Sequence, residues 1–174
     1  MDDVTAAAHA AVAWLDAHNG RSPGEVSVRV GKVAEELGEA WAAWIGVTGQ
    51  NPRKGRTHTP ADVADELADV VLAATTASLS LPEPGPPTAP DVAEAGDVAG
   101  ALLGLTAAVG RAASTRSDNG DNGETGETGD TAARLADVVA AARTTIAQLG
   151  FDPDTVLARR AAAVRARFSG SEPR

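Results

Sequence analysis

The sequence predicts an all-α protein, and three observations lead to that expectation. Alanine, the strongest helix former, is abundant along most of the chain. Apolar residues recur at helical spacing in several segments, while alternating β-branched segments are nearly absent. Clear Gly, Pro and Asn breakers separate these segments from one another. At 174 residues the chain has the length of one domain, so we expect a single helical domain over 1–174.

The first two helices are delimited by breakers. The first is predicted from about Asp3 to His18, where Asn19-Gly20 ends it. The second begins near Pro23, because proline is favoured in the first turn of a helix, and runs to about Gly46. Its apolar residues keep the spacing of a buried face; they are Val26, Val30, Val33, Leu37, Trp41 and Trp44.

The third helix opens after Thr59-Pro60, with Thr59 as its predicted N-cap. The residues expected to be buried are Val63, Leu67, Val70, Val71 and Ala74. The second and third helices together occupy about 23–80.

The second half alternates between helices and segments that resist helix formation. A Pro-rich connector is predicted at 81–90, because Pro82–Pro87 cannot be helical. A helix follows over 91–113, and an acidic, Gly-rich loop at about 115–130 is expected to be disordered. A further helix over 131–149 ends at Gly150, and Asp152-Pro153 opens a basic helix over about 153–168.

Charge and composition restrict the partners. With 24 Asp and Glu against 15 Lys and Arg, the net charge of -9 disfavours a nucleic-acid polymer or an anionic membrane as partner. The absence of cysteine removes disulfides, thiolate catalysis and Cys-based zinc sites. The first residues do not resemble a basic-then-apolar signal peptide, so we expect a cytoplasmic protein.

Two carboxylate-rich helical segments carry the functional signal. Because a helix turns roughly 100° per residue, Glu36 and Glu39 share one face of the second helix. Glu66 and Asp69 likewise share one face of the third helix. If the two helices pack side by side, four oxygen ligands converge.

Four carboxylates suit a magnesium ion, which prefers oxygen ligands and often shares its shell with substrate phosphates; Mn²⁺ is a possible substitute. Glu35 or Glu36 is then the expected residue to orient or deprotonate a metal-bound water. This combination suits hydrolysis of a phosphoanhydride.

A purely structural interpretation competes with this one. Glutamate on a helix is often only a solvated residue, and Lys32 four positions before Glu36 is placed for an ordinary ion pair. However, both segments place carboxylates beside an apolar stripe. That repetition favours the metal site.

The pattern Glu35-Glu36-x-x-Glu39 followed by Glu66-x-x-Asp69 resembles the signature of the MazG-like, all-α nucleoside triphosphate pyrophosphohydrolase superfamily. Clear resemblance covers about 30–74, including Asn51–Thr59, which looks like a loop of actinobacterial MazG-like proteins. The resemblance implies an antiparallel helical bundle that forms a homodimer or higher oligomer. It also implies that Mg²⁺ is bound by Glu36, Glu39, Glu66 and Asp69, with Glu35 and Glu36 as catalytic residues.

Substrate contacts are implied less directly. Trp14 and His18 resemble a base-binding pair, although they also suit a core residue and a helix C-terminal residue. The last helix looks like one whose basic residues approach phosphates: Arg160 and Arg167 fit, but Val164 replaces an Asn. Lys32 is a further candidate substrate contact, and Arg53 and Lys54 are alternative phosphate contacts that equally suit a solvated loop.

Three functions follow as hypotheses. The first is magnesium-dependent hydrolysis of a (deoxy)nucleoside triphosphate to the monophosphate and pyrophosphate, for example in cleansing of the nucleotide pool. The second is a similar reaction on phosphoribosyl-ATP, and the third is a non-catalytic nucleotide-binding or regulatory bundle. The base and sugar preference stays open. The exposed apolar surface expected at Trp41 and Trp44 gives a physical reason for an oligomer.

Overall fold

The structure, a computed structural model, describes residues 2–82, 97–117 and 126–169. Within these ranges every regular secondary-structure element is an α-helix, which confirms the predicted all-α class. The helices are α1 (Asp3–Asn19), α2 (Pro23–Thr48), α3 (Pro60–Leu79), α4 (Val98–Ser117), α5 (Gly126–Gln148) and α6 (Pro153–Ser169).

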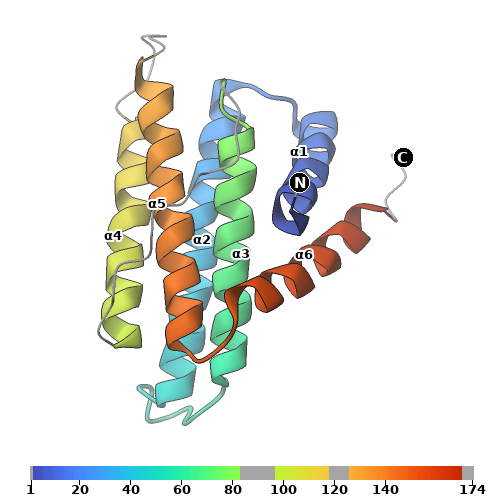
Figure 1. The fold of residues 1–174 in the computed structure, drawn as a ribbon. Helices are drawn as coiled ribbons and strands as arrows, with labels where there is room; N and C mark the ends of the chain where they lie inside the picture. Colours follow the sequence, from blue (N-terminus) through green and yellow to red (C-terminus); the bar gives the residue numbers. More distant parts are fainter. Residues whose placement is uncertain (1, 83–96, 118–125, 170–174) are drawn as a thin grey trace.

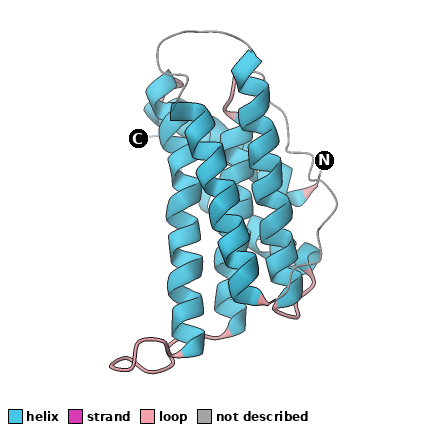
Figure 2. Ribbon diagram, turned by 90° about the vertical axis from the view of Figure 1, so that its left-hand side faces the viewer, coloured by secondary structure: helices cyan, strands magenta, loops and turns pink. Residues whose placement is uncertain are grey.

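Four of the helices form a bundle whose neighbours run antiparallel (Figure 1). In this bundle α2 packs on α3 and α4, and α5 packs on α3 and α4. Helices α1 and α6 contact each other and both lie against α3, outside the four-helix arrangement. In the side view of Figure 2, the axes of the bundle helices are roughly parallel to one another. Helix α3 is therefore central, with partners on several sides.

The predicted apolar stripes form the core. Every residue predicted to be buried in α3 is buried, and in α2 the stripe from Val26 to Leu37 is buried as well. Trp41 and Trp44 are only half-buried, packed against this core, and the Trp41 indole donates to the Thr106 hydroxyl at 2.9 Å. Helix α4 thus covers part of the surface that was expected to require a second subunit.

Helix boundaries follow local capping chemistry. The Ser22 hydroxyl accepts from the Glu25 amide, with Pro23 in the first turn, so α2 begins where predicted. Thr59 is the N-cap of α3, as predicted, and it also forms a reciprocal capping box with Asp62. Gly49 ends α2 in the left-handed conformation at φ 70°.

Helices α4 and α5 differ from the prediction at the acidic loop. Helix α4 continues to Ser117, and α5 begins at Gly126, so the expectation of a disordered loop is wrong for 126–130. Thr131 is buried and its hydroxyl donates to that of Thr115 at 3.1 Å, which joins the two helices near this end. Extending α5 toward its N-terminus then adds hydrogen bonds without a new nucleation cost.

The remaining expectations for this region fall largely outside the described residues. The acidic segment 118–125, most of the Pro-rich connector (83–90) and the first part of the helix predicted from Asp91 (91–96) are not described. Leu81 and Pro82, at the start of the predicted connector, are non-helical as expected, and Leu81 is buried.

Helix α4 includes an 18-residue window, Val98–Thr115, that is long and apolar enough to cross a membrane by length and composition. One third of that window is buried inside the protein, including Leu102 and Leu105. One such window is weak evidence for a membrane span, because a bundle helix with an apolar inner face passes the same test.

The loop that joins α2 to α3 folds back onto α2 at Gly46. The Thr57 amide donates to the Gly46 carbonyl at 3.0 Å. A side chain at position 46 would collide with the His58 ring and the Thr57 hydroxyl. Glycine is therefore needed here for close approach of the loop.

Candidate metal centre

Three predicted metal ligands meet on the paired faces of α2 and α3. One carboxylate oxygen from each of Glu36, Glu39 and Glu66 lies within 4.8 Å of the others. The two helices pack antiparallel through their apolar stripes, so the acidic residues beside those stripes are brought face to face. Glu36 and Glu66 are half-buried and Glu39 is exposed, so the cluster lies at the rim of the core.

Partial burial and like charges dominate the electrostatics of the cluster, and nearby cations offset them only in part. Partial burial raises the pKa of Glu36, and the charges of Asp69 and Glu39 act in the same direction against the opposing effect of Lys32. Partial burial also raises the pKa of Glu66, with Glu39 and Asp69 adding to it and Arg160 opposing it. Both groups are thus held toward their neutral forms, and a bound cation would reverse this by favouring the carboxylates.

Asp69, the fourth predicted ligand, stands outside this cluster of three. The Arg160 guanidinium of α6 holds it with two bonds, the Nε atom donating to Oδ1 at 2.7 Å and an Nη atom donating to Oδ2. The charge of Asp69 still acts on Glu36 and Glu66. Asp69 therefore belongs to the same electrostatic site but is bound to a cation of the chain.

The predicted catalytic pair is divided between two environments. Glu36 belongs to the cluster, whereas the Glu35 side chain is 58% exposed and outside it. The Lys32 ammonium bridges the two, at 2.6 Å from Glu35 Oε2 and 2.8 Å from Glu36 Oε1. Although burial opposes it, hydrogen bonding to both carboxylates raises the pKa of Lys32. The ordinary ion pair anticipated for Lys32 is therefore present.

A cavity of about 220 Å³ adjoins the acidic residues. Its polar wall includes Glu36 and Asp69 together with three cations from different parts of the chain, which are Arg29, Lys32 and Arg167. Its apolar wall consists of Ala11, Leu72, Ala73, Val164 and Phe168 beside Thr76. Carboxylates, cations and an apolar surface thus line the same open pocket.

The other predicted substrate contacts do not line this cavity. The rings of Trp14 and His18 stack with centroids 4.0 Å apart, and Trp14 packs at 5.8 Å from the cavity residue Phe168. The exposed residues Arg53 and Lys54 lie in the loop beyond the end of α2. At about 1.5 Å per residue, that loop is more than ~10 Å along the helix from Glu39.

Sequence reasoning missed Arg29, which is buried in α2 and borders the cavity. Its guanidinium donates to Asp16 at 2.7 Å, Glu25 at 3.1 Å, the Ser80 hydroxyl at 3.0 Å and the Gly20 carbonyl at 2.9 Å. A charged residue between Val26, Val30 and Val33 on an apolar stripe was the available signal.

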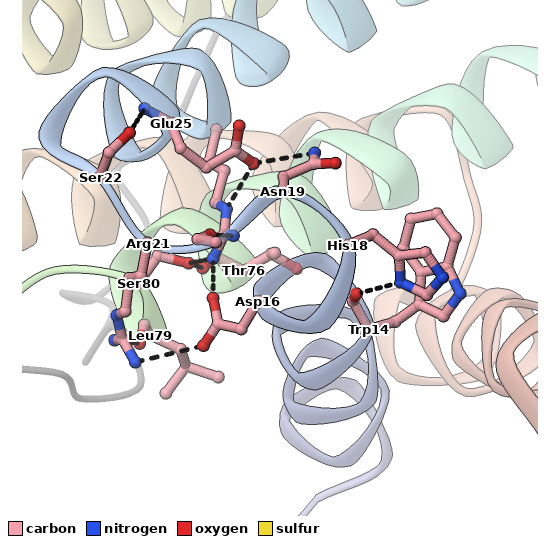
Figure 3. Close-up of polar contacts among 12 residues, drawn as sticks. Trp14, Asp16, His18, Asn19, Arg21, Ser22, Glu25, Thr76, Leu79 and Ser80 are labelled. Carbon is pink, nitrogen blue, oxygen red and sulfur yellow. Dashed lines mark hydrogen bonds and ion pairs between the residues drawn. The ribbon is translucent and has the colours of Figure 1, made fainter. Parts of the chain in front are cut away.

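Figure 3 shows the polar network around the start of α2. Arg21 donates to the Asp16 carboxylate and to the Leu79 carbonyl, and Ser22 caps α2 by accepting from the Glu25 amide. Trp14 and His18 lie on the opposite side of α1 from Asp16, with His18 Nδ1 at 2.7 Å from the Trp14 carbonyl. On one face of α1, Asp16 joins the network around Arg29, while Trp14 and His18 stack on the opposite face.

The donor set fits a hard divalent cation. All three clustered donors are carboxylate oxygens, the ligand type that Mg²⁺ and Mn²⁺ prefer, and their mutual repulsion would be relieved by a cation. The donor chemistry does not distinguish between these two ions.

No protein-family model, curated protein or solved structure matches this chain. The resemblance to MazG-like enzymes therefore rests on the sequence motifs alone.

Proposed function

We propose that this protein is a magnesium-dependent pyrophosphohydrolase that converts a (deoxy)nucleoside triphosphate to its monophosphate and pyrophosphate. The observation that carries this proposal is the convergence of Glu36, Glu39 and Glu66 beside a cavity with both cationic and apolar walls. Anionic phosphates need a cationic surface and a metal, while a base needs an apolar one.

In this proposal Glu36, Glu39, Glu66 and Asp69 hold Mg²⁺, or Mn²⁺ in its place. The bound ion supplies charge neutralisation for the phosphates and makes a coordinated water more acidic. Glu36 is the residue we assign to proton removal from the attacking water, because it belongs to the acidic cluster and also lines the cavity. Glu35 is exposed and paired with Lys32, so it assists by positioning Lys32.

The reaction is a water attack on the α-phosphorus. A bond forms between the water oxygen and phosphorus, the bond from that phosphorus to the oxygen bridging the α and β phosphates breaks, and pyrophosphate leaves. Glu36 takes the proton of the water. Lys32 and Arg167 are the cavity-lining cations that we assign to phosphate oxygens, and we assign Leu72 and Phe168 to the base.

The test is pyrophosphate release from a panel of common and modified nucleoside triphosphates, with and without Mg²⁺. We expect release that requires the metal and falls by about 100-fold or more in Glu39→Gln, which removes one ligand charge at an exposed position. Asp130→Asn is the matched control, because it removes an exposed carboxylate at the far start of α5. Full activity in Glu39→Gln and Asp69→Asn would overturn the assignment.

Two other functions are distinguished by the same panel. Turnover of phosphoribosyl-ATP with none of the nucleoside triphosphates would favour the related reaction on a phosphoribosyl metabolite. Tight nucleotide binding without product would favour the non-catalytic bundle.

We also propose that the chain forms a homodimer or higher oligomer. Support comes from the resemblance and from large apolar side chains exposed on α2 and α4, namely Val28, Ile45 and Leu103. A monomer mass by light scattering at assay concentration would contradict this.

A further inference from the structure

Two cations of the chain itself are bound to two of the four proposed metal ligands. Lys32 contacts Glu36, and Arg160 contacts Asp69 through both carboxylate oxygens. In contrast, neither Glu39 nor Glu66 forms an ion pair with any residue in the described ranges. In the described residues, two carboxylates of the site are therefore already paired with a cation, and two are not.

The contact between Arg160 and Asp69 is the stronger of the two arrangements. It is bidentate, and both side chains are shielded, at 27% exposure for Arg160 and 13% for Asp69. Bidentate contacts between a guanidinium and a carboxylate are among the strongest hydrogen bonds in proteins, whereas the Lys32 side chain is 48% exposed and shared between two acids. A metal ion that binds Asp69 must first displace at least one of these bonds.

Packing of α6 explains why the guanidinium is held at this point. Leu157 and Ala161, on either side of Arg160 in α6, are buried. Arg159 next to it contacts Asp65 of α3, four residues before Asp69. The two adjacent arginines thus pair with the two aspartates of one α3 face, but only Asp69 acts on the acidic cluster.

We propose that Arg160 competes with the divalent ion for Asp69, so that the ion enters the site by exchanging with the guanidinium. This inference rests on the proposed function, because it assumes that Asp69 is a metal ligand. Its consequence is that Arg160 lowers the affinity of the site for the metal, and that metal binding releases Arg160 from α3.

Binding of Mn²⁺ alone, measured by the paramagnetic resonance signal of the free ion, tests the competition without any turnover. In Arg160→Gln we expect about tenfold tighter binding, which corresponds to about 1.4 kcal/mol, because the ion no longer has to displace a charge-assisted pair. Arg159→Gln is the matched control: it removes the same charge from the adjacent residue and should change the affinity less than about twofold.

Arg160→Lys separates competition from general charge. Lysine keeps the positive charge but cannot form the bidentate contact, so we expect Mn²⁺ to bind more tightly than in the wild type. An affinity equal to that of the wild type would overturn the inference. Because lysine keeps the charge next to Asp69, this variant also remains informative if Arg160→Gln does not fold by circular dichroism.

A double-mutant cycle with Asp69→Asn completes the test. We expect Arg160→Gln to tighten Mn²⁺ binding only when Asp69 is present, because the contested ligand is otherwise absent. Equal tightening in both backgrounds would overturn the competition alone. If Glu39→Gln instead binds Mn²⁺ with the same affinity as the wild type, both the metal site and the competition are overturned.

Discussion

The Lys32 ammonium lies 2.8 Å from Glu36 Oε1, so a cation one helical turn away contacts a member of the acidic cluster directly. The contact is local, between residues four apart on α2, and it opposes the effect of burial on Glu36. Lys32 also lines the cavity. One residue therefore offsets the charge of Glu36 and also forms part of the cavity wall.

Substitution Lys32→Gln is expected to raise the pKa of Glu36 further above its ordinary value. The hydrogen bond and the charge of Lys32 both lower that pKa, so their loss leaves burial and the charges of Asp69 and Glu39 unopposed. Carboxyl ¹³C chemical shifts followed during a pH titration give the measurement. Lys54→Gln is the charge-matched control in the distant loop, and an equal change in both variants would contradict the direct contact.

The acidic cluster should make the folded state more stable as the pH falls toward 4.5. The pKa values of Glu36 and Glu66 are raised above the ordinary 4.5, so the folded state binds these protons at a higher pH than the unfolded chain does. Their contribution to stability is fully present below 4.5 and is lost as the pH rises through the raised values.

Thermal midpoints of the metal-free protein, measured from neutral pH down to 4.5, test this sign. On acidification we expect the thermal midpoint of the wild type to rise relative to that of a Glu36→Gln, Glu66→Gln double variant, in which both side chains stay neutral. The carboxyls with lowered pKa values, Asp2, Asp62 and Asp152, act with the opposite sign and only below about 3.8. Parallel curves for the two proteins would contradict the prediction.

Arg29→Gln should destabilise the protein by about 3 kcal/mol, because it removes one partner of a buried charge network. The Arg29 side chain is 3% exposed and joins the end of α1 to α2 and to Ser80 after α3. Urea denaturation gives the free energy of unfolding. Arg21→Gln is the control at the same place: its side chain is 42% exposed, and a cost within about 1 kcal/mol is expected. Similar losses in both variants would show that burial of Arg29 is not the cause.

Gly46→Ala should destabilise the protein by about 1–3 kcal/mol, because the added carbon meets His58 and Thr57 in a filled space. Gly31→Ala in the same helix has open space around it and should stabilise by about 0.5–1 kcal/mol through helix propensity. Chemical denaturation measures both variants. Partial recovery in a Gly46→Ala, His58→Ala double variant would identify the clash, and a stabilised Gly46→Ala protein would refute it.

The starts of α2 and α3 were predicted correctly, because short-range capping signals set them. The N-cap at Thr59 and the start of α2 at Pro23 depend on residues within one turn, and both are where they were predicted. The start of α5 was wrong because a segment without apolar residues was expected to stay disordered. Its helical state follows from joining a packed helix, and that depends on contacts such as Thr131 with Thr115.

By itself, the sequence determined the helical class, the buried stripes and the placement of Glu36, Glu39, Glu66 and Asp69 on two helix faces. These follow from a repeat of roughly 100° per residue, which acts along one segment at a time. Only the tertiary structure decided that three of those carboxylates meet while Asp69 pairs with Arg160, 91 residues away. Contacts of that kind depend on how α6 packs on α3, and helical spacing along the chain carries no information about it.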